Sequence, residues 1–209
     1  MDKLRLIQCG VGGFGKSWLK EVSSKSPDFE VIAIVDISQD NLAKAGTDAG
    51  IAADRQFATL ETALAAVSAD AVLSVTPPPV HVQHARLAFA RGLHLMTEKP
   101  FADTIEHARE MLRLAQGSGR QLLVSQNYRY RPVISRAKQL LADKAAGNFG
   151  HGHVDFYIPA DFTGTFREKM EFPLLVDMAI HHLDLIRHVT GRNIVKVTTL
   201  SIRPGWFLS

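Results

Sequence analysis

The sequence contains very little cysteine, since Cys9 is the only one among 209 residues. A single cysteine excludes a disulfide within the chain, and its position at the end of an apolar run favours a small buried residue over a reactive thiol. The first apolar run, Leu4 to Cys9, begins so close to Met1 that a secretory signal does not fit before it. No apolar run approaches the length of a membrane span, so we expect a cytoplasmic protein.

Clusters of like charge and of metal ligands are also scarce. Lysine and arginine number 24 against 21 acidic residues, and this mild excess is spread along the chain. The densest basic and aromatic stretch, Tyr128 to Arg131, is too short to indicate a nucleic-acid partner. The histidine pairs at 151/153 and 181/182 do not supply the three or four convergent ligands of a zinc site, so we expect no metal.

The first part of the chain alternates apolar strands with helices of about ten residues. This alternation is typical of βαβ units, and strands that are apolar throughout predict a parallel sheet covered on both faces. We therefore expect an α/β fold, a doubly wound parallel sheet formed by residues 1–126. The expected strands are 4–9, 29–35, 71–75, 93–97 and 122–125, and the expected helices are 17–26, 39–49, 59–67, 80–91 and 104–116.

The character of the sequence changes near residue 127. The patterns there predict two helices, 133–144 and 173–190, and two strands, 149–158 and 193–202. Two strands and two helices are too few for an independent domain. We therefore expect residues 127–209 to form the beginning of an incomplete, truncated second domain.

A glycine-rich turn follows the first strand and precedes the first helix. Gly10, Gly12 and Gly15 satisfy the dinucleotide fingerprint G-x-G-x-x-G, and Gly10, Gly15, Lys16 and Ser17 also satisfy the triphosphate P-loop pattern. Both patterns place phosphate against free backbone N–H groups at a helix N-terminus. The turn alone does not choose between these two interpretations.

Asp36 ends the second strand, 21 residues after Gly15. In a dinucleotide-binding fold an acid at this place accepts hydrogen bonds from the ribose hydroxyls of the adenosine. It would also repel a 2′-phosphate, and residues 37–43 contain no Arg or Lys to bind one, so NAD is favoured over NADP. The strand could also be the magnesium-binding strand of a P-loop enzyme, or Asp36 a simple turn residue.

Two further segments carry residues suited to proton transfer. Lys99, in Glu98-Lys99-Pro100, follows a strand end, where parallel sheets bind ligands and a lysine can polarise a carbonyl. Asp177 and His181 lie four residues apart on one helical face, where an aspartate can orient a basic imidazole. A solvated loop lysine and a packed helix histidine are the plainer interpretations of each segment taken alone.

Taken in order, these pieces resemble the Gfo/Idh/MocA oxidoreductase family, which includes glucose–fructose oxidoreductase and inositol dehydrogenase. The resemblance covers nearly the whole chain, and the combination of E-K-P with D-x-x-x-H is specific. Four stretches carry it: Gly10–Gly15, Thr76-Pro77-Pro78-Pro79-Val80-His81, Glu98-Lys99-Pro100 and Asp177-Met178-Ala179-Ile180-His181.

The resemblance implies a Rossmann domain followed by a mainly antiparallel α+β domain, and NAD(P)-dependent hydride transfer on a small sugar or polyol hydroxyl. It assigns catalysis to Lys99, Asp177 and His181, with His181 as the base, and places Asn127 and Asp184 near the substrate. Full-length relatives are expected to be homo-oligomers. The residues implied to bind the cofactor are Gly10, Gly12, Gly13, Phe14, Gly15, Asp36, Thr76, Pro77, His81, Glu98 and Lys99.

The chain also departs from the family pattern. Ala179 replaces the usual glycine of D-x-G-x-H, and family members commonly extend well beyond the length of this chain. The dehydrogenase interpretation covers both an active enzyme and an inactive fragment of one. Two alternatives stand beside it. One is a non-catalytic NAD-binding sensor or interaction module, and the other is a P-loop nucleotidase.

Overall fold

A computed structural model describes residues 3–145, 147–157, 162–164 and 166–202. The chain divides into two compact units, Met1–Ser125 and Gln126–Ser209. Each unit is built from elements that are contiguous in sequence, and the two are described in turn.

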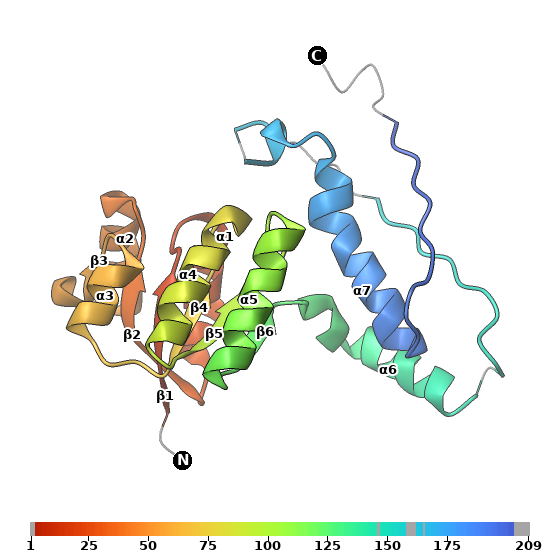
Figure 1. The fold of residues 1–209 in the computed structure, drawn as a ribbon, viewed down its shortest axis with the longest axis horizontal. Coiled ribbons are helices and arrows are strands. Elements are labelled where there is room, and N and C mark those ends of the chain that lie inside the picture. The colour runs from red at the N-terminus through yellow and green to blue at the C-terminus, as the bar shows by residue number, and fades with distance from the viewer. Residues whose placement is uncertain (1–2, 146, 158–161, 165, 203–209) are drawn as a thin grey trace. The chain divides into compact units, whose positions relative to one another are not determined.

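The first unit is built on a parallel sheet of six strands (Figure 1). The strand order is β3-β2-β1-β4-β5-β6, the order of a doubly wound dinucleotide-binding sheet. This confirms the predicted fold class. The strands are β1 (Leu4–Cys9), β2 (Phe29–Val35), β3 (Gln56–Phe57), β4 (Ala71–Ser74), β5 (His94–Thr97) and β6 (Leu122–Val124).

Five helices connect these strands, and their ends follow local capping chemistry. The hydroxyls of Ser38, Thr59 and Thr104 each accept a hydrogen bond from a backbone N–H in the first turn of the helix that follows. Gly50 and Gly119 end two of the helices in the left-handed conformation that glycine favours. The helices are α1 (Gly13–Glu21), α2 (Gln39–Ala49), α3 (Leu60–Ala66), α4 (Pro78–Ala90) and α5 (Ile105–Ser118).

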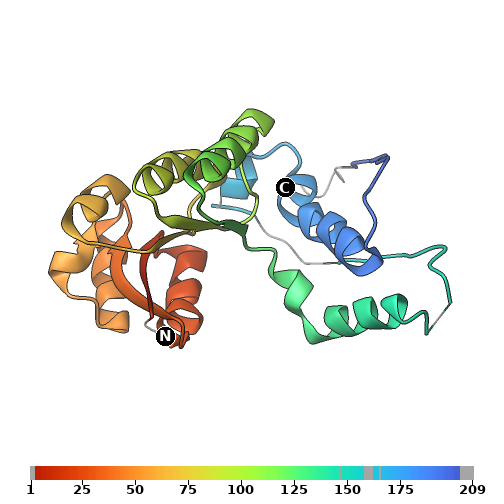
Figure 2. The ribbon, with the colours of Figure 1, turned by 60° about the horizontal axis from the view of Figure 1, so that its bottom comes forward.

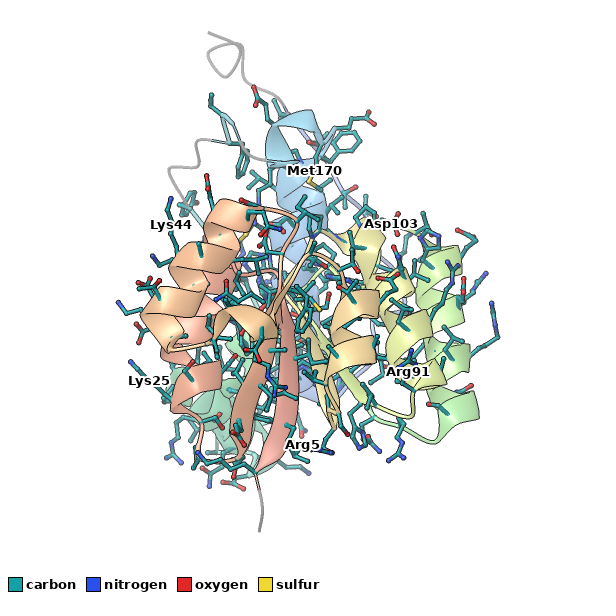
Figure 3. The ribbon with its side chains drawn as sticks, turned by 90° about the vertical axis from the view of Figure 1, so that its left-hand side faces the viewer. Arg5, Lys25, Lys44, Arg91, Asp103 and Met170 are labelled. Atoms are coloured by element: carbon teal, nitrogen blue, oxygen red, sulfur yellow. The ribbon has the colours of Figure 1, made fainter. Side chains whose placement is uncertain are left out.

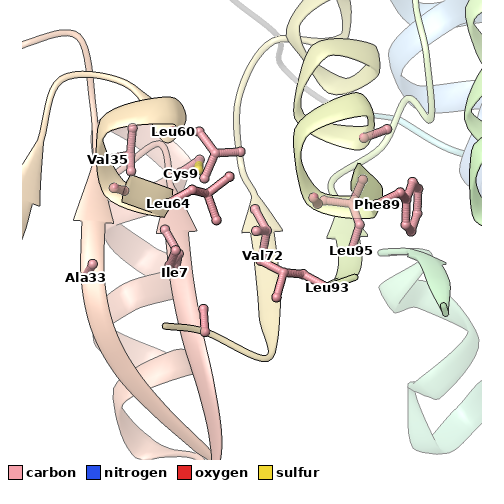
Figure 4. Packing of buried hydrophobic residues seen from close by; sticks show 14 of the residues in the cluster. Ile7, Cys9, Ala33, Val35, Leu60, Leu64, Val72, Phe89, Leu93 and Leu95 are labelled. Atoms are coloured by element: carbon pink, nitrogen blue, oxygen red, sulfur yellow. The ribbon is translucent and has the colours of Figure 1, made fainter. Parts of the chain in front are cut away.

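The helices cover both faces of the sheet, α1 and α2 on one side and α4 and α5 on the other (Figure 2). The larger core joins β1, β2, β4 and β5 to α3, α4 and α5, with Ile7, Val72 and Leu95 almost fully buried (Figure 4). Cys9 is fully buried here, as its sequence context indicates, and burial raises the pKa of its thiol. Charged side chains such as Lys25 and Lys44 lie on the outer surface (Figure 3).

The carboxyl ends of three strands meet at the centre of the sheet. Cys9, the last residue of β1, pairs with Val35 at the end of β2 and with Ser74 at the end of β4. The loops that follow these strands therefore leave the sheet side by side. Ligands of open parallel sheets bind at such an edge, next to the point where the strand order reverses.

The second unit contains helices and, among its described residues, no strand. The helices are α6 (Pro132–Ala142) and α7 (Ala179–Thr190), with 3₁₀ turns at Asn127–Tyr130 and Phe166–Lys169 and a π-helical turn at Leu174–Met178. The predicted strands are wrong for the described residues 149–157 and 193–202, and residue 158 lies outside those described. A strand needs a hydrogen-bonded neighbour, and neither segment pairs with one here. No helix in the described ranges is both long and apolar enough to cross a membrane.

Candidate functional site

The glycine turn between β1 and α1 depends on glycine at defined positions. Gly10 has a φ of +84°, and its N–H donates to the Val35 carbonyl oxygen at 2.7 Å. A Cβ at Gly10 would overlap the Val75 carbonyl, and a Cβ at Gly15 would overlap the Gly10 carbonyl. The first glycine therefore permits the sharp turn, and the last lets α1 approach the end of β1.

Asp36, at the end of β2, is bonded across this turn. One carboxylate oxygen accepts hydrogen bonds from the N–H groups of Val11 and Gly12, at 3.0 Å and 3.1 Å. The other accepts from the Ser38 N–H at 2.9 Å and from the Asn41 side-chain amide at 3.3 Å. Two backbone N–H groups of the glycine turn thus point at the Asp36 carboxylate, which holds the turn against the end of β2.

A cavity of about 680 Å³ opens at this edge of the sheet. Of the residues predicted to bind a cofactor, Gly10, Gly12, Gly13, Asp36, Thr76 and Pro77 line it. Its carboxylates are Asp36 and Glu61, and its lining contains neither lysine nor arginine. Ser38, Asn41, Thr59, Gln83 and His84 also line it, and our sequence analysis did not select them as site residues.

Lys16, the lysine of the P-loop pattern, points to a neighbouring helix. Its ammonium lies 3.0 Å from the carboxylate of Asp48 on α2, and both side chains are more than half exposed. A P-loop lysine instead reaches the β- and γ-phosphates. Together with the strand order, this contact argues against the triphosphate interpretation of the turn.

His81 was expected to line the cofactor site, but its ring is fully buried and lies outside the cavity lining. Its Nε2 lies 2.9 Å from the Thr76 carbonyl oxygen and its Nδ1 3.1 Å from the Phe101 carbonyl oxygen. Burial lowers the pKa of His81, and a neutral ring donates to one of these two carbonyls. His81 therefore supports the turn after β4 from the core side, because its place on the inner face of α4 directs its ring into the core.

His84, one turn further along α4, is the histidine that lines the cavity. Its Nδ1 lies 2.8 Å from the Ser74 hydroxyl, which lies 2.9 Å from the Thr76 hydroxyl. Burial lowers the pKa of His84 to about 4, so the ring is neutral at physiological pH. The sequence feature that could have identified His84 is its spacing of three residues from His81, because residues three apart lie on the same helical face.

The segment after β5 holds Glu98 and Lys99. Glu98 is 7% exposed, and its carboxylate accepts hydrogen bonds from the indole N–H of Trp18 at 2.7 Å and from the Lys99 backbone N–H at 3.0 Å. Glu98 therefore points into the protein. Lys99 is half-buried and precedes a cis peptide bond to Pro100. Phe14 is 58% exposed, and Phe14, Gly15, Glu98 and Lys99 lie outside the cavity lining.

In the second unit, Asp177 lies in the π-helical turn that precedes α7. Its side chain is 2% exposed, and one carboxylate oxygen accepts a hydrogen bond from the Arg167 guanidinium at 2.7 Å. A buried carboxylate needs such a partner, because an uncompensated charge away from water is costly. Our sequence analysis did not identify Arg167 as the partner of Asp177, since no spacing rule links it to the motif ten residues later.

His181, on the first turn of α7, is 4% exposed. The Tyr128 ring stacks on its imidazole, with ring centroids 4.1 Å apart and ring planes 10° from parallel. The Arg131 guanidinium carbon lies 3.7 Å from the centroid of the same tyrosine ring. Two groups this close to one ring must lie on its opposite faces, so the order is Arg131, Tyr128, His181.

The two residues predicted to lie near the substrate differ in their surroundings. Asp184 is 12% exposed, and both its oxygens accept hydrogen bonds from Arg129, each at 2.5 Å. This bidentate pair occupies the Asp184 carboxylate. Asn127 begins the 3₁₀ turn before α6, and its side chain is exposed.

The sequence matches a known family and several characterised proteins. Residues 4–126 match the family described as "Oxidoreductase family, NAD-binding Rossmann fold". D-apiose dehydrogenase from Paraburkholderia graminis is 32% identical over 78% of this chain and 43% of its own length. Inositol 2-dehydrogenase from an Arthrobacter species is 27% identical over 98% of this chain and 58% of its own length.

A solved structure shares the fold. The crystal structure of an oxidoreductase from Agrobacterium radiobacter, in complex with NAD+, L-tartaric acid and magnesium, superimposes with a TM-score of 0.79. It is 24% identical, and the match covers 91% of this chain and 55% of that one. The chain therefore spans about half the length of the proteins that it matches.

Proposed function

This chain belongs to the Gfo/Idh/MocA oxidoreductase family, and we propose that it transfers hydride between a hydroxyl-bearing substrate and NAD. The observation that carries the proposal is the cavity at the carboxyl edge of the sheet. Its lining combines the glycine turn at the start of a helix with an acid that follows the second strand. This is the arrangement that holds a dinucleotide, with pyrophosphate at the helix N-terminus and ribose at the acid.

The residues present fit the adenosine half of NAD. A Cβ at Gly10 would overlap the Val75 carbonyl and a Cβ at Gly12 would meet the Asn41 amide, so the tight turn of a dinucleotide site depends on glycine here. The lining includes the carboxylates of Asp36 and Glu61, which are suited to a ribose, and it contains no lysine or arginine for a 2′-phosphate. These features support NAD over NADP, because a third phosphate would meet carboxylates without a compensating charge.

We assign the chemical steps to Lys99, His181 and Asp177. When bound, the nicotinamide supplies the hydride acceptor. Lys99, at the carboxyl end of β5, stabilises the negative charge that develops on the substrate oxygen, and His181 accepts the hydroxyl proton. Asp177, whose carboxylate is held by Arg167, orients His181 or the substrate. These roles follow from the matching positions of the family motifs.

The proposed substrate is a small sugar, polyol or related hydroxyl compound. The named relatives support this class, since they are dehydrogenases of apiose and inositol. Asn127 is the proposed substrate contact in the turn before α6, because its side chain is exposed. Asp184 is a weaker candidate, since Arg129 already occupies its carboxylate.

Calorimetry with NAD+, NADP+ and ATP·Mg2+ separates the possible classes, followed by turnover on a panel of sugars and polyols. We expect NAD+ binding, and turnover that falls at least about 100-fold in Lys99→Ala and in His181→Ala. Turnover that survives both substitutions would refute the assigned residues. NAD+ binding without turnover on any substrate would favour the sensor alternative, and ATP·Mg2+ binding without NAD+ binding would favour a nucleotidase.

A further inference from the structure

The glycine turn and the lysine segment are joined by one side-chain contact. Trp18 lies on α1, the helix whose first turn contains the glycines, and its indole N–H donates to a Glu98 oxygen at 2.7 Å. The second Glu98 oxygen accepts from the Lys99 backbone N–H at 3.0 Å. The two ends of this connection are 80 residues apart in the sequence.

The burial of Glu98 restricts its carboxylate to hydrogen-bond donors inside the protein. Glu98 is 7% exposed, so each carboxylate oxygen depends on the donors available to it inside the protein. One donor comes from α1 and the other from the backbone of the proposed catalytic lysine. A carboxylate held at both oxygens has little rotational freedom, so it fixes the Lys99 backbone relative to α1.

The position of Trp18 relates this pair to the cofactor turn. Gly12 and Gly13, at the start of α1, line the cavity, and Trp18 lies on the second turn of the same helix. A helix is rigid over two turns, so a ligand that shifts or orders the start of α1 also moves the indole. Through Glu98, that displacement reaches Lys99.

We propose that Trp18 and Glu98 are positioning residues that couple the occupancy of the glycine turn to the placement of Lys99. The proposal rests on the proposed function, because it uses the role assigned to Lys99. Trp18 and Glu98 act through the Lys99 backbone and not on the substrate. The geometry thereby gives the glutamate of the E-K-P segment a role other than contact with the cofactor.

Trp18→Phe tests the coupling, because it keeps an aromatic ring and removes the N–H. Glu98→Gln is the second variant, since glutamine keeps one accepting oxygen, and its amide nitrogen, which is a donor, cannot replace the other. Trp206→Phe is the matched control, since it makes the same substitution at the other tryptophan and assigns the indole resonances. Each protein is studied as the full chain, by kinetics and by ¹H–¹⁵N NMR with ¹⁵N-lysine and ¹⁵N-tryptophan.

We expect Trp18→Phe and Glu98→Gln to lower kcat about tenfold, as loss of one hydrogen bond to a charged group would, with KM and the NAD+ dissociation constant within about twofold. In the wild-type protein, NAD+ should shift both the Trp18 indole resonance and the Lys99 amide resonance. In Trp18→Phe the NAD+-induced shift of the Lys99 amide should largely disappear. Lys99→Arg identifies that amide resonance.

Two results would overturn the coupling. One is an unchanged kcat in Trp18→Phe beside a lowered melting temperature, which shows a contact that stabilises the fold alone. The other is a Lys99 amide shift on NAD+ addition that is the same in Trp18→Phe as in the wild type. The NMR result decides the coupling even when no substrate turns over, and absence of turnover in the wild type counts only against the proposed catalytic function.

Discussion

The Tyr128 ring lies parallel to the imidazole of His181, with their centroids 4.1 Å apart. The Arg131 guanidinium covers the opposite face of the tyrosine. Tyr128 precedes α6 and His181 belongs to α7, so the stack joins the two long helices of the second unit. A flat partner on one face of an imidazole limits its rotation, which is what a base that must meet a substrate hydroxyl requires.

Tyr128→Leu removes the flat partner of His181 and should lower kcat about three- to tenfold, since aromatic pairs contribute about 0.5–1.5 kcal/mol. Tyr128→Phe keeps the ring and should retain most of the activity. Steady-state kinetics of both variants, with circular dichroism to verify folding, measures the effect. Equal activity in the two variants would show that the ring does not position the imidazole.

Arg167→Met leaves the Asp177 carboxylate, which is 2% exposed, without its guanidinium partner. The free energy of unfolding should fall by about 2 kcal/mol, because a buried charge loses a charge-assisted hydrogen bond. Urea unfolding measures the change. Arg187→Met is the control, since the Arg187 side chain is exposed and its guanidinium donates to the neutral side chain of Asn193. A similar loss in both variants would contradict a special role for Arg167.

His84 should make stability depend on pH between about 6.5 and about 4, because burial lowers its pKa to about 4. Its contribution is fully present above the unfolded pKa and is lost as pH falls, since the unfolded chain then binds a proton that the folded protein excludes. The limit for one such group is about 3 kcal/mol.

Urea unfolding at several pH values tests this in His84→Asn, whose amide can still bond Ser74. The variant should show a weaker loss of stability on acidification than the wild type, with His81 accounting for part of what remains. His151→Asn, at an exposed position, is the control and should behave as the wild type does. Parallel curves for the wild type and His84→Asn would contradict the prediction.

The double variant Asp36→Ser with Ile37→Arg should reverse the preference for NAD+ over NADP+. Serine keeps an acceptor for the turn amides but removes the repulsion of a 2′-phosphate, and Ile37, 93% exposed at the cavity, is placed to carry a cation. By calorimetry, the wild type should bind NAD+ at least about tenfold more tightly than NADP+. The double variant should bind NADP+ more tightly than NAD+. Ile37→Gln alone should leave the preference unchanged, and equal affinities in the wild type would refute the role given to Asp36.

The secondary structure of the first unit follows closely from local sequence. Strand β2 and helix α2 have the predicted bounds, and the Ser38 hydroxyl caps α2. Strand β3 was missed because its two residues, Gln56 and Phe57, carry no recognisable period. In the second unit, residues 193–202 have the composition of a strand, yet they pair with nothing in the described ranges, and Val195 is 98% exposed.

The sequence by itself determined the glycine turn, the acid after the second strand and the order of motifs that identifies the family. These depend on residues close together in the chain, or on spacings that a strand or helix converts directly into position. Only the tertiary structure decided that His81 lies behind its turn while His84 lines the cavity, and that Glu98 meets Trp18 and His181 meets Tyr128. Such contacts join residues far apart in sequence, and the packing of whole elements selects them.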